Sequence, residues 1–341
     1  MGKNCVSRGA SMKLKMNLRQ ASQTYFSVFY LITGVLFYKA VHLLPTLGVA
    51  ALEYRSPAVE AFLPISALLA LKQWVILGVW DRIHPAGLAI LLLTICSSLL
   101  LKRGFCSHLC PVGTASELVG QIRRKIPLQI SPINRELHYL LLLPKYFILG
   151  FFLYVILFGM SIEAVVSFLH SPYNTVSDVK MLHFFLEPSA LTLQVITVLV
   201  LLSVIVQNFW CRYLCPYGAL LNLFAVFSPL TIRRDCVTCC FCRQCDSACP
   251  NGILISNAHT VTSPECTLCQ KCLAVCPEAR TLSIHFRVGG VRLNPIHYSA
   301  LVICFFIIGI SLAKLAGYWE SPLLAQFWIK FVPTLHSLEH P

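Results

Sequence analysis

Two cysteine-rich stretches, CCFCRQCDSACP at residues 239–250 and CTLCQKCLAVCP at residues 266–277, decide how this chain is organised. Both contain the pattern C-x2-C-x2-C-x3-C-P, whose cysteines are Cys239, Cys242, Cys245 and Cys249 in the first stretch and Cys266, Cys269, Cys272 and Cys276 in the second. This spacing lets three thiolates bind one [4Fe–4S] cluster while the fourth binds the neighbouring cluster. Structural zinc is the alternative for paired C-x2-C motifs. Because the steps overlap and the whole pattern occurs twice, we predict two [4Fe–4S] clusters.

The composition places these cysteines in a membrane protein. Of the 341 residues, 57% are hydrophobic and only 12% are charged, whereas a soluble globular protein has about 25% charged residues. The 17 cysteines would indicate disulfides in a small secreted chain. Here at least eight have cluster spacing, which predicts a reducing compartment instead.

Five apolar stretches are candidates for membrane-spanning helices, each of which needs roughly 20 residues. They cover residues 24–45, 86–101, 138–160, 190–210 and 296–316. The segment 61–80 is ambiguous, and we interpret residues 56–85 as a helical hairpin or interfacial segment that leads into the second stretch. The alternative is that residues 61–80 form a span of their own. The pattern predicts a mainly α, polytopic membrane helical bundle with about five spans.

The distribution of Lys and Arg predicts the orientation of these spans. With five spans and the N-terminus inside, 19 basic residues lie in the inner segments 1–23, 102–137 and 211–295. Only five lie in the outer segments 45–85, 161–190 and 317–341. Since positive residues favour the cytoplasmic side, the N-terminus and the cysteine-rich stretches are expected there. The net charge of +13 is then explained by anionic lipid, and no nucleic-acid partner is expected.

The chain also repeats a shorter cysteine motif, C-x3-C-P. It occurs in FCSHLCPVG at 105–113 and in WCRYLCPYG at 210–218, each time after an apolar stretch, which predicts a parallel internal repeat. Proline suits the first position of a helix and cysteine the cap before it, where the helix dipole favours a thiolate. The four cysteines Cys106, Cys110, Cys211 and Cys215 are therefore a candidate redox or metal site. The alternatives are Cu(I) ligands or ordinary buried cysteines.

Taken together, these motifs resemble the polytopic membrane ferredoxins of the NapH type and the membrane core of NosR-type and CcoG-type proteins. The resemblance implies a bacterial inner-membrane protein with a two-cluster bacterial ferredoxin-like α+β domain inserted at 231–287. It also implies that Cys239, Cys242 and Cys245 bind one cluster with Cys276, and that Cys266, Cys269 and Cys272 bind the other with Cys249. The expected domains are a basic N-terminus (1–23), membrane repeats (24–125 and 138–227), the cluster domain (231–287), a last helix (296–316) and a tail (317–341).

The function expected from these features is electron transfer, as a component of an oxidoreductase system and not as a stand-alone catalyst. Electrons would pass between a membrane or periplasmic partner and the two cytoplasmic clusters, whose soluble partner would be a ferredoxin, a flavodoxin or a reductase subunit. Quinol is a candidate membrane partner, with His84 and His183 as candidate residues of a quinone site. The alternatives are a redox-sensing regulatory protein and a copper reductase that uses the C-x3-C-P cysteines.

Overall fold

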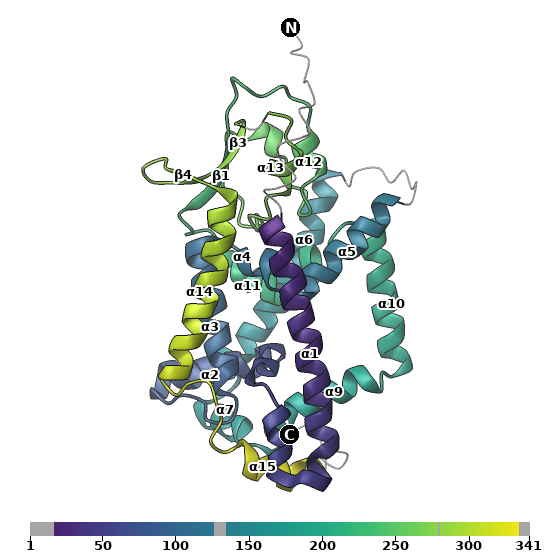
Figure 1. Cartoon of the computed structure of the whole chain (residues 1–341), viewed down its shortest axis with the longest axis vertical. Coiled ribbons are helices and arrows are strands. Elements are labelled where there is room, and N and C mark those ends of the chain that lie inside the picture. The colour runs from purple at the N-terminus through teal and green to yellow at the C-terminus, as the bar shows by residue number, and fades with distance from the viewer. Residues whose placement is uncertain (1–16, 126–133, 279, 334–341) are drawn as a thin grey trace. The chain divides into compact units, whose positions relative to one another are not determined.

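The computed structural model describes residues 17–125, 134–278 and 280–333, which are mainly helical (Figure 1). The chain divides into two compact units. Unit 1 comprises residues 1–27, 94–148 and 198–306, and unit 2 comprises residues 28–93, 149–197 and 307–341. Within the described residues, the unit boundaries fall inside five helices, α1, α3, α6, α10 and α14.

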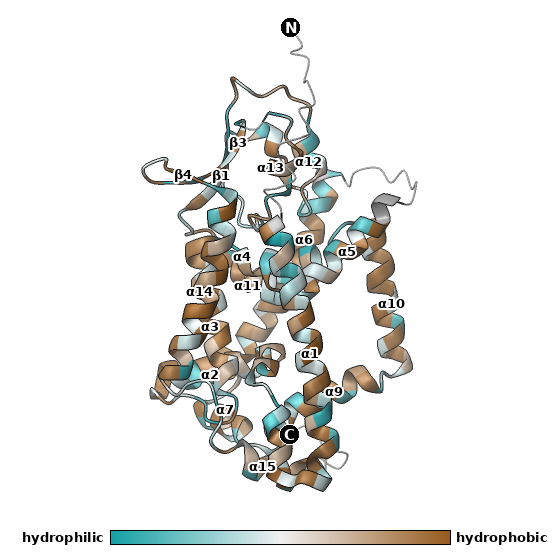
Figure 2. Ribbon diagram, in the orientation of Figure 1, coloured by the Kyte–Doolittle hydropathy of each residue, from teal (hydrophilic) through white to brown (hydrophobic). Residues whose placement is uncertain are grey.

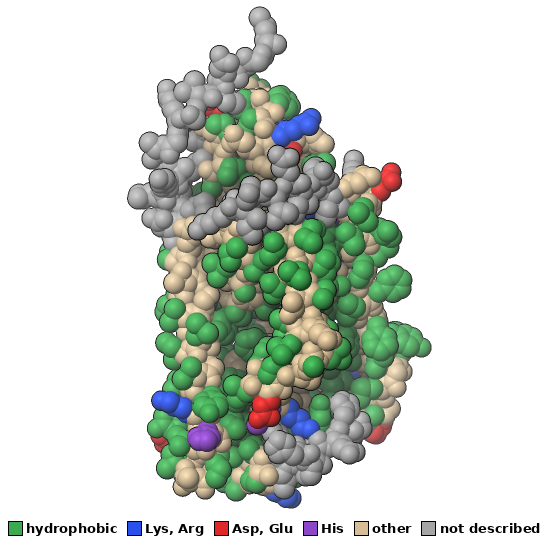
Figure 3. Space-filling view, turned by 90° about the vertical axis from the view of Figure 1, so that its right-hand side faces the viewer, with side chains coloured by type: hydrophobic (Ala, Val, Ile, Leu, Met, Phe, Trp, Pro, Cys, Tyr) green, Lys and Arg blue, Asp and Glu red, His purple; other side chains and the backbone are tan. Residues whose placement is uncertain are grey.

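Three apolar helices are long enough to cross a membrane. They are α1 (Asn17–Leu47), α6 (Arg135–Tyr154) with its π-helical continuation Val155–Gly159, and α14 (Pro295–Leu315). A fourth is counted if α9 (Ser177–Leu186) and α10 (Ala190–Ile205), which are bent by 76° at their junction, form one broken span. Figure 2 shows hydrophobic residues along most of α10 and α14, and hydrophobic side chains dominate the face drawn in Figure 3. The prediction of a helical membrane protein is confirmed.

Two further apolar helices are shorter than a full span. Helix α2 (Pro64–Leu77) has 14 residues, or about 21 Å, and α3 (Pro85–Leu101) has 17, or about 25 Å. The hydrocarbon core is about 30 Å thick. Helix α2 ends because Gly78 adopts φ 69°, a left-handed conformation that glycine tolerates. Segment 61–80 thus contains a short helix that precedes α3, and its helix alone does not have the length of a span.

Unit 2 is built from short helices around apolar cores. Besides the elements above it contains two 3₁₀ helices, Gly48–Tyr54 and Pro57–Phe62, and the helices α7 (Ile162–Leu169), α8 (Pro172–Thr175) and α15 (Leu324–Phe331). Two of these begin at a Ser-Pro pair, where the Ser56 and Ser171 hydroxyls accept backbone N–H bonds of 3.3 and 3.2 Å. Trp328 of α15 is fully buried and packs against Phe37 of α1, which fixes that helix to the core of the unit.

Unit 1 combines helices with a small antiparallel sheet. Its short helices are α4 (Gly104–His108), α5 (Pro111–Lys125), the π-helical turn Trp210–Leu214, α11 (Pro216–Ala225), α12 (Gln244–Ser247), the 3₁₀ turn Ile255–Asn257 and α13 (Lys271–Val275). The strands are β1 (Leu230–Arg234), β2 (Thr260–Val261), β3 (Leu282–Phe286) and β4 (Arg292–Leu293), in the order β2-β1-β3-β4. Ile232 of β1 lies opposite both Val261 and Ile284, and all three are buried. This apolar row supports the loops that carry the cysteine runs.

Candidate functional site

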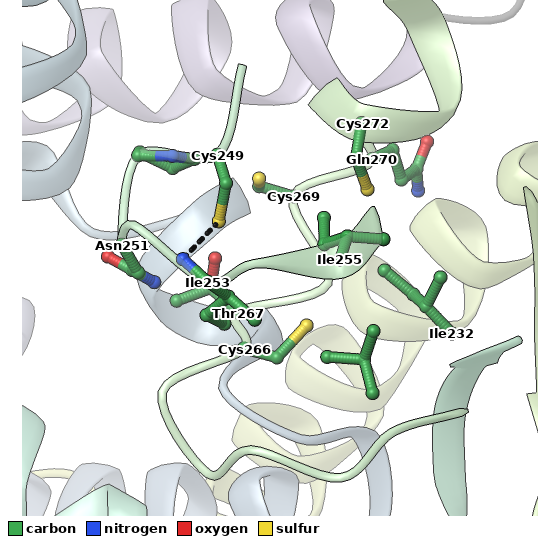
Figure 4. A pocket seen from close by; sticks show the side chains of 12 residues that line it. Ile232, Cys249, Asn251, Ile253, Ile255, Cys266, Thr267, Cys269, Gln270 and Cys272 are labelled. Atoms are coloured by element: carbon green, nitrogen blue, oxygen red, sulfur yellow. Dashed lines mark hydrogen bonds between the residues drawn. The ribbon is translucent and has the colours of Figure 1, made fainter. Parts of the chain in front are cut away.

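One cavity of unit 1 is lined by three cysteines of the second run and by the last cysteine of the first. These are Cys266, Cys269, Cys272 and Cys249, which lie around about 330 Å³ of empty space (Figure 4). Ile232, Ile253 and Ile255 complete an apolar wall. The cysteines thus surround a space and do not converge on a point. This is the arrangement that a cubane cluster with one thiolate at each iron requires.

A second cavity has the reciprocal lining. Cys239, Cys242 and Cys245 of the first run meet Cys276 of the second run around about 370 Å³ of empty space. Arg234 and Leu282 contribute to the same wall. The structure therefore brings together both of the crossed sets of four cysteines that the ferredoxin resemblance implied.

The two cysteine loops share an unusual backbone conformation. Positive φ angles occur at Phe241 (56°) and Arg243 (56°) in the first run, and at Leu268 (47°) and Gln270 (63°) in the second. These residues flank the second cysteine of each run. A left-handed conformation costs a non-glycine residue roughly 1–2 kcal/mol, and alternation of right- and left-handed residues turns successive N–H groups toward one side, which creates an anion-binding concavity. Sequence reasoning missed these four residues because none of them is glycine.

Burial disfavours the thiolate form of two of the cluster cysteines before iron binds. It raises the pKa of Cys249 to about 12 and that of Cys245 to about 11. The backbone N–H of Ile253 donates a 3.4 Å hydrogen bond to the Cys249 sulfur (Figure 4). Because thiolates are the ligands, iron must displace protons, and cluster binding is coupled to folding of these loops.

The comparison with known proteins identifies the family. A family model described as a 4Fe-4S binding domain matches the chain twice, at residues 83–129 and 188–234. The chain is 34% identical over 327 residues to the protein named "Putative electron transport protein YccM" of Escherichia coli (strain K12), a match that covers 94% of this chain and 91% of that protein. The chain belongs to the family of ferredoxin-type membrane proteins.

Other relatives of this membrane ferredoxin match about half of its length. "Ferredoxin-type protein NapH" of Escherichia coli (strain K12) is 28% identical over 172 residues, which are 49% of this chain and 55% of NapH. "Regulatory protein NosR" of Stutzerimonas stutzeri is 29% identical over 182 residues, which are 51% of this chain and 23% of NosR. No solved structure matches the chain. The resemblance predicted from the cysteine motifs is confirmed, and the protein is a ferredoxin-type iron–sulfur membrane protein of electron transport.

The two segments matched by the family model contain the C-x3-C-P motifs and end before Cys239. In the membrane ferredoxin, α5 and α11 begin at the prolines of these motifs. Cys215 is the N-cap of α11, and its sulfur accepts a 3.3 Å hydrogen bond from Gly218 N–H. The prediction of cysteine at the cap and proline at the first helical position is confirmed. Cys211 interacts electrostatically with Cys106, Cys110 and Cys215, so the four cysteines lie in one neighbourhood of unit 1.

The carboxylate of Glu265 lies beside the cavity that Cys266 lines, and its partner Arg103 interacts with Cys106 and Cys215 of the C-x3-C-P motifs. Glu265, which precedes Cys266, accepts hydrogen bonds from Arg103 Nη1 (3.2 Å) and Lys145 Nζ (2.6 Å). Its pKa is lowered, because these two cations outweigh the opposing effect of burial. Asn222 Nδ2 donates to the same carboxylate at 2.8 Å. Glu265 is a residue that sequence reasoning missed, because a glutamate beside a cysteine run carries no spacing signal.

A similar ion group lies beside the second run. Glu117 pairs with Arg19 and with Lys271, whose Nζ is 3.2 Å away. These cations lower the pKa of Glu117 to about 2 against the effect of burial. Lys271 is buried, so its charge faces Glu117.

The two candidate quinone-site histidines have different surroundings within unit 2. His84 is fully buried, with Nε2 2.8 Å from the Asn174 carbonyl and Nδ1 3.6 Å from the Glu60 carboxylate. His183 is about one-third exposed, with Nδ1 4.0 Å from Glu187. Burial lowers the pKa of His84, but the interaction with Glu60 outweighs it and raises the pKa to about 9. A quinone site at either histidine stays a prediction.

Proposed function

We propose that this protein relays electrons one at a time between a redox partner in or outside the membrane and two [4Fe–4S] clusters on the cytoplasmic side. The first cluster is held by Cys239, Cys242, Cys245 and Cys276. The second is held by Cys266, Cys269, Cys272 and Cys249. In this proposal the chain crosses the bacterial inner membrane five times, at the five apolar stretches of the sequence, which contain α1, α3, α6, α10 and α14. Four of these crossings use the membrane-length helices and the bent pair α9–α10, and the fifth uses the shorter helix α3.

The crossed lining of the two cavities is the observation that carries the proposal. Each cavity takes three cysteines from one run and the fourth from the other run. That arrangement supports two clusters next to each other in one folded loop region, as a relay between them requires. Four thiolates per cluster leave no iron open for substrate, so the clusters suit electron transfer and not catalysis.

Quinol is the membrane partner that suits this arrangement. Oxidation of one quinol to a quinone releases two electrons and two protons, and the two clusters can take one electron each. On the cytoplasmic side the partner would be a ferredoxin, a flavodoxin or a reductase subunit. Electrons could also enter from that side and reduce quinone.

The test is turnover of the clusters in native membranes. Iron and acid-labile sulfide are quantified on the anaerobically purified full chain, and the dithionite-reduced clusters are followed by EPR as quinone is added. We expect the added quinone to reoxidise the reduced clusters as fast as the protein turns over. The Cys239→Ser/Cys242→Ser variant should lose the relay, while the exposed-cysteine variant Cys304→Ser should keep it. Clusters that assemble but exchange no electrons with quinone or soluble acceptors would overturn the relay.

Redox sensing is the second candidate, because two of the relatives are named regulatory proteins. A sensor would change its cluster oxidation state and would then show a slow, stoichiometric response. The same experiment separates the two functions, since a relay consumes many equivalents of reductant per chain and a sensor consumes about one per cluster.

A further inference from the structure

The wall of the first cluster cavity contains a buried arginine. Arg234 is the last residue of β1, and its side chain lines the space that Cys239, Cys242, Cys245 and Cys276 surround. Only 7% of the residue is exposed. Because a buried charge is unfavourable unless it is paired and hydrogen-bonded, the groups that face this guanidinium decide its role.

The described residues satisfy only part of the Arg234 guanidinium. Its Nε donates a 3.0 Å hydrogen bond to the Ala258 carbonyl oxygen, and its Cζ lies 5.3 Å from the centre of the Phe241 ring, within the range of a cation–π contact. Its Nη1 is buried and has no hydrogen-bond partner in the part of the chain that the structure describes. A buried N–H donor without an acceptor destabilises a fold, so an acceptor in the cavity is expected.

No carboxylate group among the described residues forms a salt bridge with Arg234. Asp246, which follows Cys245, instead accepts a 2.8 Å hydrogen bond from the Ser256 backbone N–H. Glu278 lines the same cavity, but it is exposed, so water and salt screen its charge. The positive charge of Arg234 is therefore available to an anion inside the cavity.

The anionic groups that the loaded cavity offers are sulfur atoms. Arg234 interacts electrostatically with Cys239 and Cys245, two ligands of the first cluster. Cysteine thiolates and the sulfides of an iron–sulfur cluster accept hydrogen bonds, and such bonds help to set the reduction potential of the cluster. The unpaired Nη1 of Arg234 therefore fits a sulfur of the cluster that this cavity would hold.

The second cluster cavity has a different wall. Its lining contains only apolar and uncharged polar residues besides the four cysteines, whereas Arg234 and the exposed Arg243 line the first cavity. Lys102 and Arg103 interact with Cys266 of the second cluster but lie outside that lining. A buried guanidinium in the cavity wall thus distinguishes the first site from the second, and the two clusters are not equivalent.

From these observations we propose that Arg234 donates an N–H···S hydrogen bond from Nη1 to a sulfur of the first cluster and stabilises the reduced form of that cluster. The inference rests on the proposed function, since it needs a cluster in the first cavity. Reduction adds one electron and no proton, so a centre that four thiolates already make anionic becomes more negative. A fixed cation and hydrogen-bond donor favour this more negative state. Arg234 therefore raises the midpoint potential of the first cluster and sets how readily that cluster takes an electron from its neighbour.

The neighbouring Arg233 provides a matched control on the same strand. Successive residues of a strand point to opposite faces of the sheet. Arg233 Nη1 lies near Gly290, between β3 and β4, where a Cβ added at that glycine would be 3.3 Å away from it. Arg233 is not among the residues that line either cluster cavity. Its substitution removes the same charge from β1 and leaves the cavity wall intact.

The first test is an EPR-monitored redox titration of the anaerobically purified full chain. We expect Arg234→Gln to make reduction of one cluster about tenfold less favourable, or about 59 mV for a one-electron couple, without a shift of the other. The shifted signal should be the one that Cys239→Ser/Cys242→Ser removes. Arg234→Lys keeps the charge but loses the planar guanidinium, so its shift should be smaller. Arg233→Gln should change neither potential, and equal iron content shows that the variants load normally.

The second test detects the hydrogen bond itself. The full chain is labelled with ¹⁵N-arginine, and pulsed EPR of the reduced protein records nuclear coupling between the label and the cluster spin. We expect ¹⁵N coupling on the first-cluster signal in the wild type and in Arg233→Gln. Arg234→Lys should lose this coupling, whereas a residue that only supports the fold would leave it unchanged.

Three results would overturn the role of Arg234. One is a wild-type first-cluster signal without ¹⁵N coupling, which needs no variant and therefore holds even if Arg234→Gln fails to fold. Another is an equal shift of both potentials in Arg234→Gln. The third is a shift in Arg233→Gln as large as the shift in Arg234→Gln. Clusters that respond to Arg234 as expected but exchange no electrons with quinone or soluble acceptors would instead contradict the relay and leave this role intact.

Discussion

Arg55 in unit 2 and Arg103 in unit 1 are both buried beside carboxylates, yet the total charge of their surroundings differs. Arg55 contacts Asp178 (2.8 Å) and Glu60 (2.9 Å), and Glu60 also faces His84. With His84 protonated, the cations Arg55 and His84 face the carboxylates of Glu60 and Asp178, and Asp81 also interacts with His84. This group therefore has no excess positive charge. Arg103 shares the single carboxylate of Glu265 with Lys145.

The same contrast extends over both units. Among the described residues, unit 1 buries seven Lys and Arg side chains and two Glu side chains. The cations are Arg19, Lys102, Arg103, Lys145, Arg212, Arg234 and Lys271, and the carboxylates are Glu117 and Glu265. Unit 2 buries two Lys and Arg side chains and three carboxylates. Since the unit with excess positive charge also holds the twelve motif cysteines, its charge is suited to anionic clusters, while unit 2 is balanced by its own side chains.

Removal of iron is therefore expected to cause the largest loss of stability, and to cause it only in unit 1. Without clusters, the buried cations lose their counter-charge and the left-handed loops at Phe241 and Leu268 lose their ligand. We expect amide protection in residues 231–278 to fall at least about 100-fold, or about 2.7 kcal/mol, in hydrogen exchange of apo against holo protein. Peptides around Arg55 and His84 are the internal control. Equal loss of protection in both units would contradict the contrast.

Breaking the balanced group should destabilise unit 2 without changing iron content. Glu60→Gln leaves Arg55 with the carboxylate of Asp178 alone, and removal of one partner of a buried ion group costs about 3–5 kcal/mol. Thermal unfolding in detergent measures the loss. Glu163→Gln, which changes an exposed carboxylate, is the matched control and should change stability by less than about 0.5 kcal/mol. A similar small change for Glu60→Gln would show that unit 2 does not depend on this balance.

The pH dependence of stability should report the charge of His84. Its pKa is about 9 in the folded protein and about 6.5 when unfolded. A raised folded pKa gives stability that is complete below pH 6.5 and is lost as the pH rises toward 9. The difference in unfolding free energy between wild type and His84→Gln should therefore shrink by roughly 3 kcal/mol from pH 6 to pH 9. The other groups that face His84 are Glu60, Asp178, Arg55 and Asp81. If the difference in unfolding free energy between wild type and His84→Gln does not change with pH, these groups and not His84 cause the pH dependence of stability.

The sequence predicted the parts of this molecule that depend on spacing. Patterns among residues that are close in sequence predict the cysteine runs, the C-x3-C-P caps and the long helices α1, α6 and α14. The charge groups could not be predicted in this way. Arg55 and Asp178 are 123 residues apart, and Arg103 and Glu265 are 162 apart. Only the tertiary fold decides which buried cation meets which carboxylate, and the left-handed Phe241 and Leu268 have no glycine to mark them.

The smallest effect tests whether Arg103 acts on the second cluster directly. Arg103→Gln removes a cation that interacts electrostatically with Cys266, so the more negative, reduced form of the second cluster is less stabilised. Its midpoint potential should fall by on the order of 60 mV, a tenfold change for a one-electron couple. Gly218→Ala adds a Cβ that would lie 2.7 Å from Arg103 Nη2, so the guanidinium must move. It should lower the potential by less than Arg103→Gln does. If both act through the guanidinium, Gly218→Ala has no further effect in the Arg103→Gln background, whereas additive shifts in the double variant would mean that the glycine acts through the helix N-terminus alone.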